Sequence, residues 1–463
     1  MSIRSDEKLG TERMLPIVFK MALPSVAAQL VNLLYGVVDK IYIGHIEGVG
    51  GEALAGVGIT TSVILFISAF SSLVGGGGSP LAAIQLGRGN REEAGRILNN
   101  GFVMLLFFAL FCTVTPYLAM DPILKLAGAE SSTLPYARDY LSIYLIGTVF
   151  VMISTGLNMF INCQGRPGVA MLSVVIGAVL NTALDPLFIF TFGLGVKGAA
   201  IATVISQAVS ATWVLAFLFS KRAELRLDFR MMKPRLKVMA GITALGISPF
   251  VMASTESLVG FTLNGQLRNY GGTVHVGALT VMQSAMQMVS IPLAGFSQGV
   301  IPVLSYNYGH GKNDRVKECF KITLAVMFGV NLVGMLFMIL FPAFIGGMFT
   351  DDMGVISTVK QYMPIFLAGM TIFGLQRTCQ NTFVALGQAK VSLFIALLRK
   401  VILLVPLVYV LPLFMEVVGV YTAEAVADAT AAILCTTIFI LTFPKILKKN
   451  EEKCALQPEL QQN

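Results

Sequence analysis

Long apolar stretches separated by short polar ones recur along the whole chain. Each apolar stretch has roughly 20 residues or more, enough for an α-helix to cross the hydrocarbon core of a bilayer. Twelve are predicted, at 16–43, 53–85, 95–120, 134–163, 168–192, 196–219, 241–268, 276–307, 316–348, 356–387, 391–414 and 418–444. The pattern lacks the short alternating strands of a membrane β-barrel. We therefore predict an all-α integral membrane protein with about 12 transmembrane helices.

Composition supports this prediction. The chain has 463 residues, of which 55% are hydrophobic and only 13% charged, whereas soluble domains carry about 25% charged residues. The six cysteines form no CxxC pair, so neither a disulfide framework nor a zinc site is indicated. The N-terminal residues have mixed charge and no small-residue cleavage site, which excludes a cleaved signal peptide.

The basic residues are distributed unevenly between the predicted loops. Most of the 33 lysines and arginines fall on one side of the membrane, and the segment 221–237 alone carries seven. The positive-inside rule then places both termini in the cytoplasm. A nucleic-acid site at 221–237 is not favoured, because the segment lacks interleaved aromatic residues and lies between two membrane helices.

The two halves of the chain resemble each other. Pro24 and Asp39 are separated by the same distance as Pro249 and Asn264, and GVKGAAIAT at 195–203 aligns with GVYTAEAVA at 419–427. The shift stays between 220 and 225 residues, which indicates two parallel six-helix repeats with a substrate site between or within them. We predict an N-lobe at 1–220, a cytoplasmic linker at 221–240, a C-lobe at 241–445 and a polar tail at 446–463.

Polar residues cluster at one predicted depth in the first half, in the outer part of the membrane. The candidates lie on the first helix (Gln29, Asn32, Tyr35 and Asp39), the fourth (Tyr140), the fifth (Asn181 and Asp185) and the sixth (Thr203). Helical spacing puts those of the first helix on one face, and likewise those of the fifth. Intramembrane carboxylates are functional candidates by default. Two carboxylates, an amide and a hydroxyl suit Na⁺ or a shared proton. Alternatively, each aspartate could merely bond to polar groups of a neighbouring helix.

Other candidate residues could have either a functional or a purely structural role. Pro24 should kink the first helix, either as a moving element or as a static bend. Asn158 is a further candidate for the substrate cavity. Met282, Gln283 and Met286 on the eighth helix suggest an adaptable wall for apolar ligands, with ordinary packing as the favoured alternative.

Three acidic residues of the second half have no acidic counterpart in the first. Glu256 could attract a cationic substrate or pair with Arg268 or Arg377. Glu424 and Asp428 are four residues apart on the twelfth helix, where Arg399 or Lys400 could neutralise one of them.

The sequence resembles the multidrug and toxic compound extrusion (MATE) transporters, especially their bacterial DinF-like and multidrug-export branch. The resemblance covers residues 10–445. It rests on Pro24, Asn32, Tyr35 and Asp39, the turn LGRGN at 86–90, NCQGRP at 162–167, LNTALDPLFI at 180–189 and GVKGAAIAT at 195–203. The tenth helix departs from the pattern of some relatives, since it has Arg377 in place of an acid.

The resemblance implies two six-helix lobes around a V-shaped cleft and export of organic, often cationic, compounds driven by H⁺ or Na⁺. It also implies a cation site at Asp39, Asn181, Asp185 and Thr203, with Tyr35 and Tyr140 nearby. We expect a monomeric, multi-pass protein of the bacterial inner membrane that binds small organic molecules, needs no cofactor and is not an enzyme. A flippase for a lipid-linked precursor remains the alternative on the same fold.

Overall fold

The computed structural model describes residues 5–460, apart from the side chains of Ser5, Ser257, Phe261 and residues 453–460. The first half contains α1 (Ser5–Thr11), α2 (Met14–Gly44), α3 (Gly50–Gly87), α4 (Arg91–Leu118), α5 (Met120–Leu126), α6 (Leu134–Ile146), α7 (Thr148–Cys163), α8 (Pro167–Pro186), the π-helix η1 (Leu187–Thr191) and α9 (Gly195–Phe219). A short 3₁₀ helix, η2 (Phe229–Met231), lies in the connection to the second half.

The second half is also helical. It contains α10 (Leu236–Gly309), α11 (Asn313–Leu340), α12 (Pro342–Phe349), α13 (Met353–Ala368), the 3₁₀ helix η3 (Gly369–Ile372), α14 (Phe373–Ala385), α15 (Ala389–Leu397), the π-helix η4 (Leu398–Leu404), α16 (Val405–Val410) and α17 (Pro412–Leu460). Because α17 continues to Leu460, residues 446–460 of the predicted polar tail are helical.

Helices lie over each of the twelve predicted stretches. In the described residues, nine helices are long and apolar enough to cross a membrane, and the pair α6 and α7, bent by 59°, makes a tenth. Helix α10 holds two of the predicted stretches, joined at Gly272, where φ is 75° and ψ is −169°. The stretch 356–387 is interrupted by η3. The prediction of an all-α membrane protein is confirmed.

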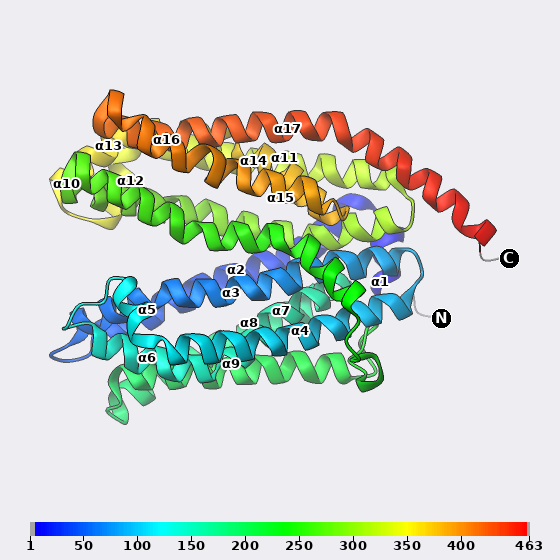
Figure 1. The fold of residues 1–463 in the computed structure, drawn as a ribbon, viewed down its shortest axis with the longest axis horizontal. Coiled ribbons are helices and arrows are strands. Elements are labelled where there is room, and N and C mark those ends of the chain that lie inside the picture. Colours follow the sequence, from blue (N-terminus) through cyan, green and yellow to red (C-terminus); the bar gives the residue numbers. More distant parts are fainter. Residues whose placement is uncertain (1–4, 461–463) are drawn as a thin grey trace.

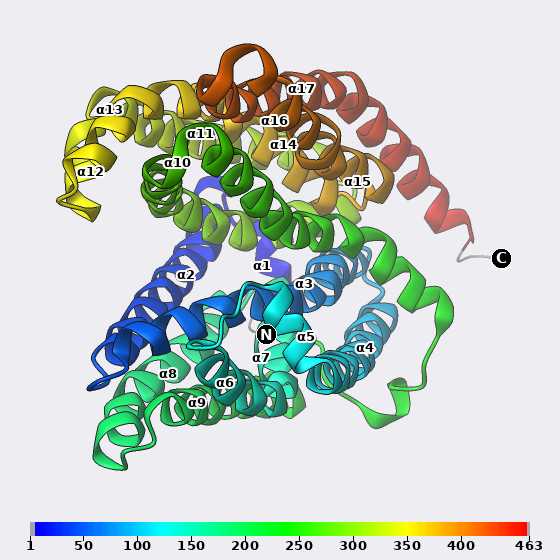
Figure 2. The same ribbon diagram turned by 60° about the vertical axis from the view of Figure 1, so that its left-hand side comes forward.

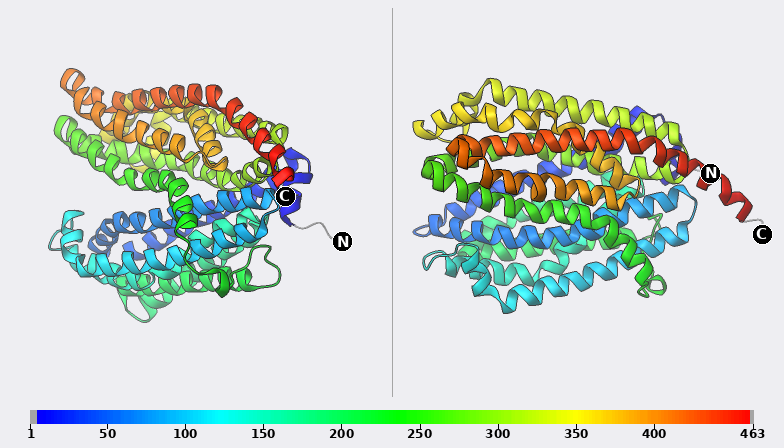
Figure 3. Two further views of the ribbon diagram at one scale, coloured as in Figure 1. Left: turned by 45° about the vertical axis from the view of Figure 1, so that its right-hand side comes forward. Right: turned by 45° about the horizontal axis from the view of Figure 1, so that its top comes forward.

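The helices form two lobes that lie side by side (Figure 1). The first lobe holds α2 to α9, and the second holds α10 to α17. Both termini lie at the same end of the bundle, called the terminal end below, and the break in α10 at Gly272 lies at the opposite end. The ribbons of the two lobes diverge towards that opposite end (Figures 2 and 3).

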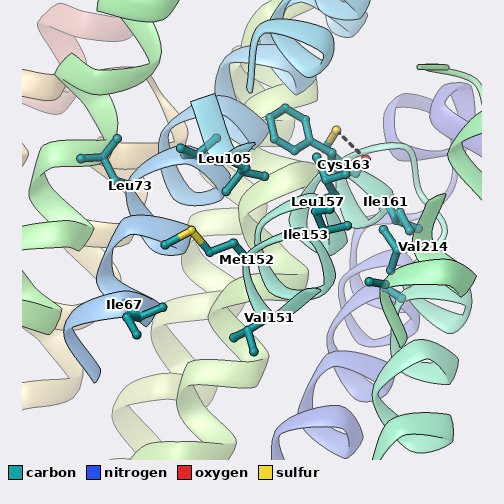
Figure 4. Close-up of a cluster of buried hydrophobic side chains, with 14 of the residues drawn as sticks. Ile67, Leu73, Leu105, Val151, Met152, Ile153, Leu157, Ile161, Cys163 and Val214 are labelled. Carbon is teal, nitrogen blue, oxygen red and sulfur yellow. Dashed lines mark hydrogen bonds between the residues drawn. The ribbon is translucent and has the colours of Figure 1, made fainter. Parts of the chain in front are cut away.

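The hydrophobic core explains why the lobes diverge. The largest cluster of buried side chains joins the first lobe to residues near the terminal end of the second, including Val300 and Leu304. Part of this cluster packs around α7, where Met152 and Leu157 lie among side chains from α3 and α4 (Figure 4). A separate cluster, which includes Leu267 and Tyr421, belongs to the second lobe alone. The lobes therefore share a core only towards the terminal end.

Glycines let the helices of the two lobes approach closely along this shared core. A methyl group on Gly246 would lie 1.8 Å from the carbonyl oxygen of Leu73, and one on Gly309 would lie 2.1 Å from that of Ile84. Small residues at membrane helix interfaces allow such backbone approach. The run of four glycines at 75–78 serves the same packing, since Gly77 lies against the backbone of α10 at Gly246.

The N-terminal helix α1 connects the lobes at the terminal end. Arg91 of the first lobe donates a 2.7 Å bond to the buried carboxylate of Asp6. Lys312 of the second lobe donates to the carbonyl oxygen of Gly10 at 3.0 Å. Helix α1 thus adds polar contacts with both lobes where the shared core ends.

We predict that Gly246→Ala destabilises the protein, because its new methyl group clashes with backbone rather than with a flexible side chain. Overpacking of this kind costs about 1–3 kcal/mol. Thermal unfolding in mild detergent can be followed with a thiol-reactive dye, since the five cysteines with described side chains are buried. Gly241→Ala on the same helix is the control, because its methyl group approaches no atom closer than 3.9 Å. Equal midpoints for the two variants would contradict the prediction.

Candidate functional site

Four of the predicted site residues meet inside the first lobe. Asn181 and Asp185 are one turn apart on α8, and the Asn181 amide donates to Asp185 Oδ1 at 3.2 Å. The same amide nitrogen lies 3.3 Å from Thr203 Oγ1 on α9. Asp39, near the end of α2, lies close enough to Asp185 for their carboxyl groups to interact directly. Three helices therefore contribute to one buried polar cluster.

The cluster contains oxygen atoms without partners. Asp39 Oδ1, Asn181 Oδ1 and Asp185 Oδ2 are buried and accept no hydrogen bond in the described part of the chain. Leaving such atoms unpaired is costly in a low-dielectric interior. Oxygen atoms from carboxylates, amides and hydroxyls are the ligands that hard cations prefer. The residues present therefore fit a small cation such as Na⁺, or a proton shared by the two carboxyl groups.

Two tyrosines border this cluster. Tyr35 on α2 faces the two aspartates and the amide of Gln207. Tyr140 on α6 lies beside Thr203 and Asp39, and its ring stacks on Tyr144 with centroids 6.1 Å apart. All six residues predicted for the cation site are thus brought together.

A cavity of about 340 Å³ adjoins the cluster within the first lobe. Its lining includes six of the predicted residues: Gln29, Asn32, Tyr35, Asn158, Asn181 and Thr203. The lining side chains are polar or apolar but uncharged, so the two aspartates lie just beyond its wall. The predicted cation and substrate residues of the first half therefore share one space.

Several lining residues were missed by sequence reasoning. They include Ser154 and Gln207, which hydrogen-bond to each other at 2.8 Å. Gln298 comes from α10 of the second lobe and accepts a 3.1 Å bond from Gln29. The serines of the second predicted helix could have drawn attention, because they interrupt an apolar pattern. A cross-lobe contact such as that of Gln298 leaves no trace in local spacing.

The candidates from the second half lie elsewhere. Met282 is fully buried in the core of the second lobe, and neither Gln283 nor Met286 lines the cavity. Glu256 forms an ion pair with Lys400, and not with either arginine considered from the sequence. These residues do not join the site in the first lobe.

Helix α2 runs without interruption from Met14 to Gly44, with Pro24 inside it. Pro24 lies four residues before Ala28 and five before Gln29, both of which line the cavity. Pro24 has no backbone N–H group, so α2 lacks one helical hydrogen bond just on the terminal side of the cavity wall.

The chain belongs to the MatE family, whose model matches residues 24–187 and again 250–410. The resemblance to MATE transporters is therefore confirmed. The double match also agrees with the predicted internal repeat, since the two matches begin and end at nearly the same shift along the chain.

Individual relatives extend over almost the whole chain. The multidrug export protein MepA of Staphylococcus haemolyticus is 24% identical over 417 residues, covering 90% of this chain and 91% of MepA. An outward-facing structure of a multidrug resistance MATE transporter matches with a TM-score of 0.89 at 22% identity, covering 96% of this chain and 99% of that one. A MATE transporter in its bent conformation matches with a TM-score of 0.88 at 23% identity, covering 97% and 100%.

We predict that the cavity is wet. A cysteine placed at Thr155, which lines the cavity on α7, should react with a membrane-impermeant thiol reagent. Thr148→Cys on the same helix is the matched control, because Thr148 is fully buried and outside the cavity. Labelling of the purified protein, measured by mass spectrometry, should be much faster at position 155. Similar rates at the two positions would contradict a water-filled cavity.

Proposed function

We propose that this protein exports organic compounds, cationic ones among them, in exchange for H⁺ or Na⁺. The observation that carries the proposal is the group of unpaired oxygens on Asp39, Asn181 and Asp185, next to a polar cavity. Membership of the MatE family and the likeness to MepA, a multidrug export protein, support the export of drugs.

The coupling cation binds at the polar cluster of the first lobe. Two carboxyl groups lie close together there in a low-dielectric interior, which favours the uptake of positive charge. A proton would be shared between Asp39 and Asp185. Na⁺ would take oxygens from the same two residues, Asn181 and Thr203.

The substrate binds in the adjoining cavity. Its wall is polar but uncharged and includes Gln29, Asn32 and Asn158. These amides can donate hydrogen bonds to varied substrates and accept them, and no charged group in the wall has to be desolvated when a substrate binds. A cationic substrate is attracted by the two aspartates just beyond the wall. The same charges attract the coupling cation, so the two ligands disfavour each other's binding.

Alternating access follows from the way the lobes are joined. The shared core, the glycine contacts and α1 hold the terminal end closed, while the lobes diverge at the other end. With both termini in the cytoplasm, as the basic loops favour, this is the outward-facing state. Cation entry displaces substrate to the outside, and the lobes then rock about their contact to open the cytoplasmic side. Movement of α2 at Pro24 links the two events.

A flippase for a lipid-linked precursor is the alternative. Its diphosphate group would need arginine or lysine side chains in the cavity, and the lining includes none. The cavity therefore favours neutral or cationic compounds.

We predict that Asp39→Asn abolishes gradient-driven efflux of ethidium from proteoliposomes, because it removes a charge that recruits the coupling cation. Efflux should be measured under a pH gradient alone and then a sodium gradient alone. Asp314→Asn, whose side chain is 98% exposed, is the control and should transport normally. The gradient that drives the wild type identifies the ion. Undiminished transport by Asp39→Asn would sink the proposal, and transport of lipid-linked substrates only would favour the flippase.

We also predict that ethidium and the coupling cation weaken each other's binding by the same factor, as thermodynamic linkage requires. Couplings of this kind are typically about 5–150-fold. Calorimetric titration with ethidium at low and at saturating cation concentration gives one side of the cycle, and cation titration with and without ethidium gives the other. Independent affinities would rule out competition through the aspartates.

A further inference from the structure

The second lobe has a counterpart of the cation-binding helices. The family model matches both halves in the same order, so the first part of α10 and the α15–η4 segment correspond to α2 and the α8–η1 segment. The aligned repeats at 195–203 and 419–427 likewise pair α9 with α17. Both middle segments contain a π-helix, η1 in one lobe and η4 in the other. Such π-helical segments often occur at functional sites.

In the second lobe, these three elements carry charged side chains. Arg399 in η4 donates a 2.5 Å bond from Nε to Asp428 Oδ1 on α17. A terminal guanidinium nitrogen of Arg399 lies 3.8 Å from Glu424 Oε1, one turn earlier on α17. The guanidinium also lies 4.1 Å from the centre of the Phe373 ring, a favourable cation–π distance.

Two buried carboxyl groups share the guanidinium of Arg399. One guanidinium faces two carboxyl groups, of which Asp428 is fully buried and Glu424 is 5% exposed. Glu424 Oε2 and Asp428 Oδ2 are both buried without a hydrogen-bond partner in the described part of the chain. A buried carboxylate without full compensation is strongly disfavoured, so one of the two groups needs another positive charge.

The neighbouring cations are committed elsewhere. Lys400 in η4 forms an ion pair with Glu256 of α10. Arg377 of α14 is within electrostatic reach of Glu256 and Arg399. Lys400 also attracts Glu424 through space, but in the described part of the chain no cation donates a hydrogen bond to Glu424.

We propose that Glu424 binds a proton and forms a second proton site of the transporter, in the second lobe. A proton fits better than a metal ion. The guanidinium of Arg399 lies only 3.8 Å away and repels a metal ion, and a metal ion would also have to lose its hydration shell. Glu424 is the acceptor because Asp428 already holds the shorter bond to Arg399. Protonation leaves the neutral pair Arg399–Asp428 and turns the orphaned Glu424 oxygen into a donor.

An exposed acid lies beside the buried groups. Glu256 is 65% exposed, whereas its partner Lys400 is 6% exposed and lies next to Arg399 along η4. The pair of Glu256 and Lys400 therefore stands between the surface of the lobe and the buried carboxyl groups of α17, and we take Glu256 as the point of proton entry. A proton delivered to Glu256 weakens its bond to Lys400, so the ammonium group can turn towards Glu424 and give it a proton. The neutral amine of Lys400 then takes the proton held by Glu256, which restores the original ion pair and leaves Glu424 protonated.

The direct test is infrared spectroscopy of the purified full-length protein in the Asp39→Asn/Asp185→Asn background, which removes the two carboxyl groups of the polar cluster in the first lobe. At neutral pH we expect a carboxylic-acid carbonyl band that disappears on Glu424→Gln. Glu416→Gln, an exposed acid of the same helix, should leave the band intact. An unchanged band in Glu424→Gln, or no band before substitution, overturns the proposal. Glu424→Asp, which keeps a carboxyl group, should shift the band and covers the case in which Glu424→Gln does not fold.

The consequence for transport rests on the proposed function and is tested separately. In proteoliposomes, Glu424→Gln should move one proton fewer per ethidium exported than the wild type, and Glu416→Gln should match the wild type. If Glu424→Gln moves as many protons per ethidium as the wild type and Asp39→Asn is inactive, then Glu424 takes no part in coupling and the proposed function still holds. Full activity of Asp39→Asn defeats the proposed function, whatever the infrared band shows.

Discussion

The absence of water in the hydrocarbon core is the constraint on which the rest of this structure depends. Every buried polar group must find its partner within the protein, because lipid offers none. Backbone groups meet this requirement by forming helices, and many side chains meet it through bonds such as that from Ser210 to the carbonyl oxygen of Ser173. Exceptions are therefore informative. Those with carboxylate oxygens include Asp39 and Asp185 in one lobe and Glu424 and Asp428 in the other.

The two lobes handle their buried acids differently, although they derive from one repeated unit. In the first lobe, Asp185 accepts a hydrogen bond from the neutral amide of Asn181, and neither aspartate forms an ion pair in the described residues. In the second lobe, Arg399 and Lys400 are built-in cations that pair with Asp428 and Glu256, and Glu424 lies 3.8 Å from the same guanidinium. The first arrangement suits exchange of a mobile cation, and the second suits a proton held beside a fixed guanidinium.

Packing bears on the movement proposed for the molecule. Contacts between the lobes involve backbone at positions such as Gly246 and Gly309, where side chains are absent. Close-packed backbones of this kind leave no slack between the lobes at the terminal end. The second lobe also has a core of its own. Both features are compatible with the proposed rocking of the lobes about their contact.

The sequence by itself determined the helices and much of the site in the first lobe. Apolar stretches predict membrane helices because backbone groups can be satisfied there within a single segment. Spacing on one helix placed Asn181 with Asp185, and the predicted depth placed Asp39 and Thr203 beside them. The structure brings these four residues together because each placement depends on local geometry and on the fixed thickness of the membrane. Their role as a cation site stays a prediction.

Only the tertiary structure decided the contacts between helices that are distant in the sequence. The bond from Gln29 to Gln298 joins opposite lobes, and Glu256 pairs with Lys400 rather than with Arg268 or Arg377. Met282 is apolar and lies on a helix with polar neighbours, yet it packs inward because of the rotation of α10 against α13 and α17. Rotation and register between helices are set by the complementary shapes of whole surfaces. For that reason, local spacing could show which polar residues share a helix face, and only packing could show what that face meets.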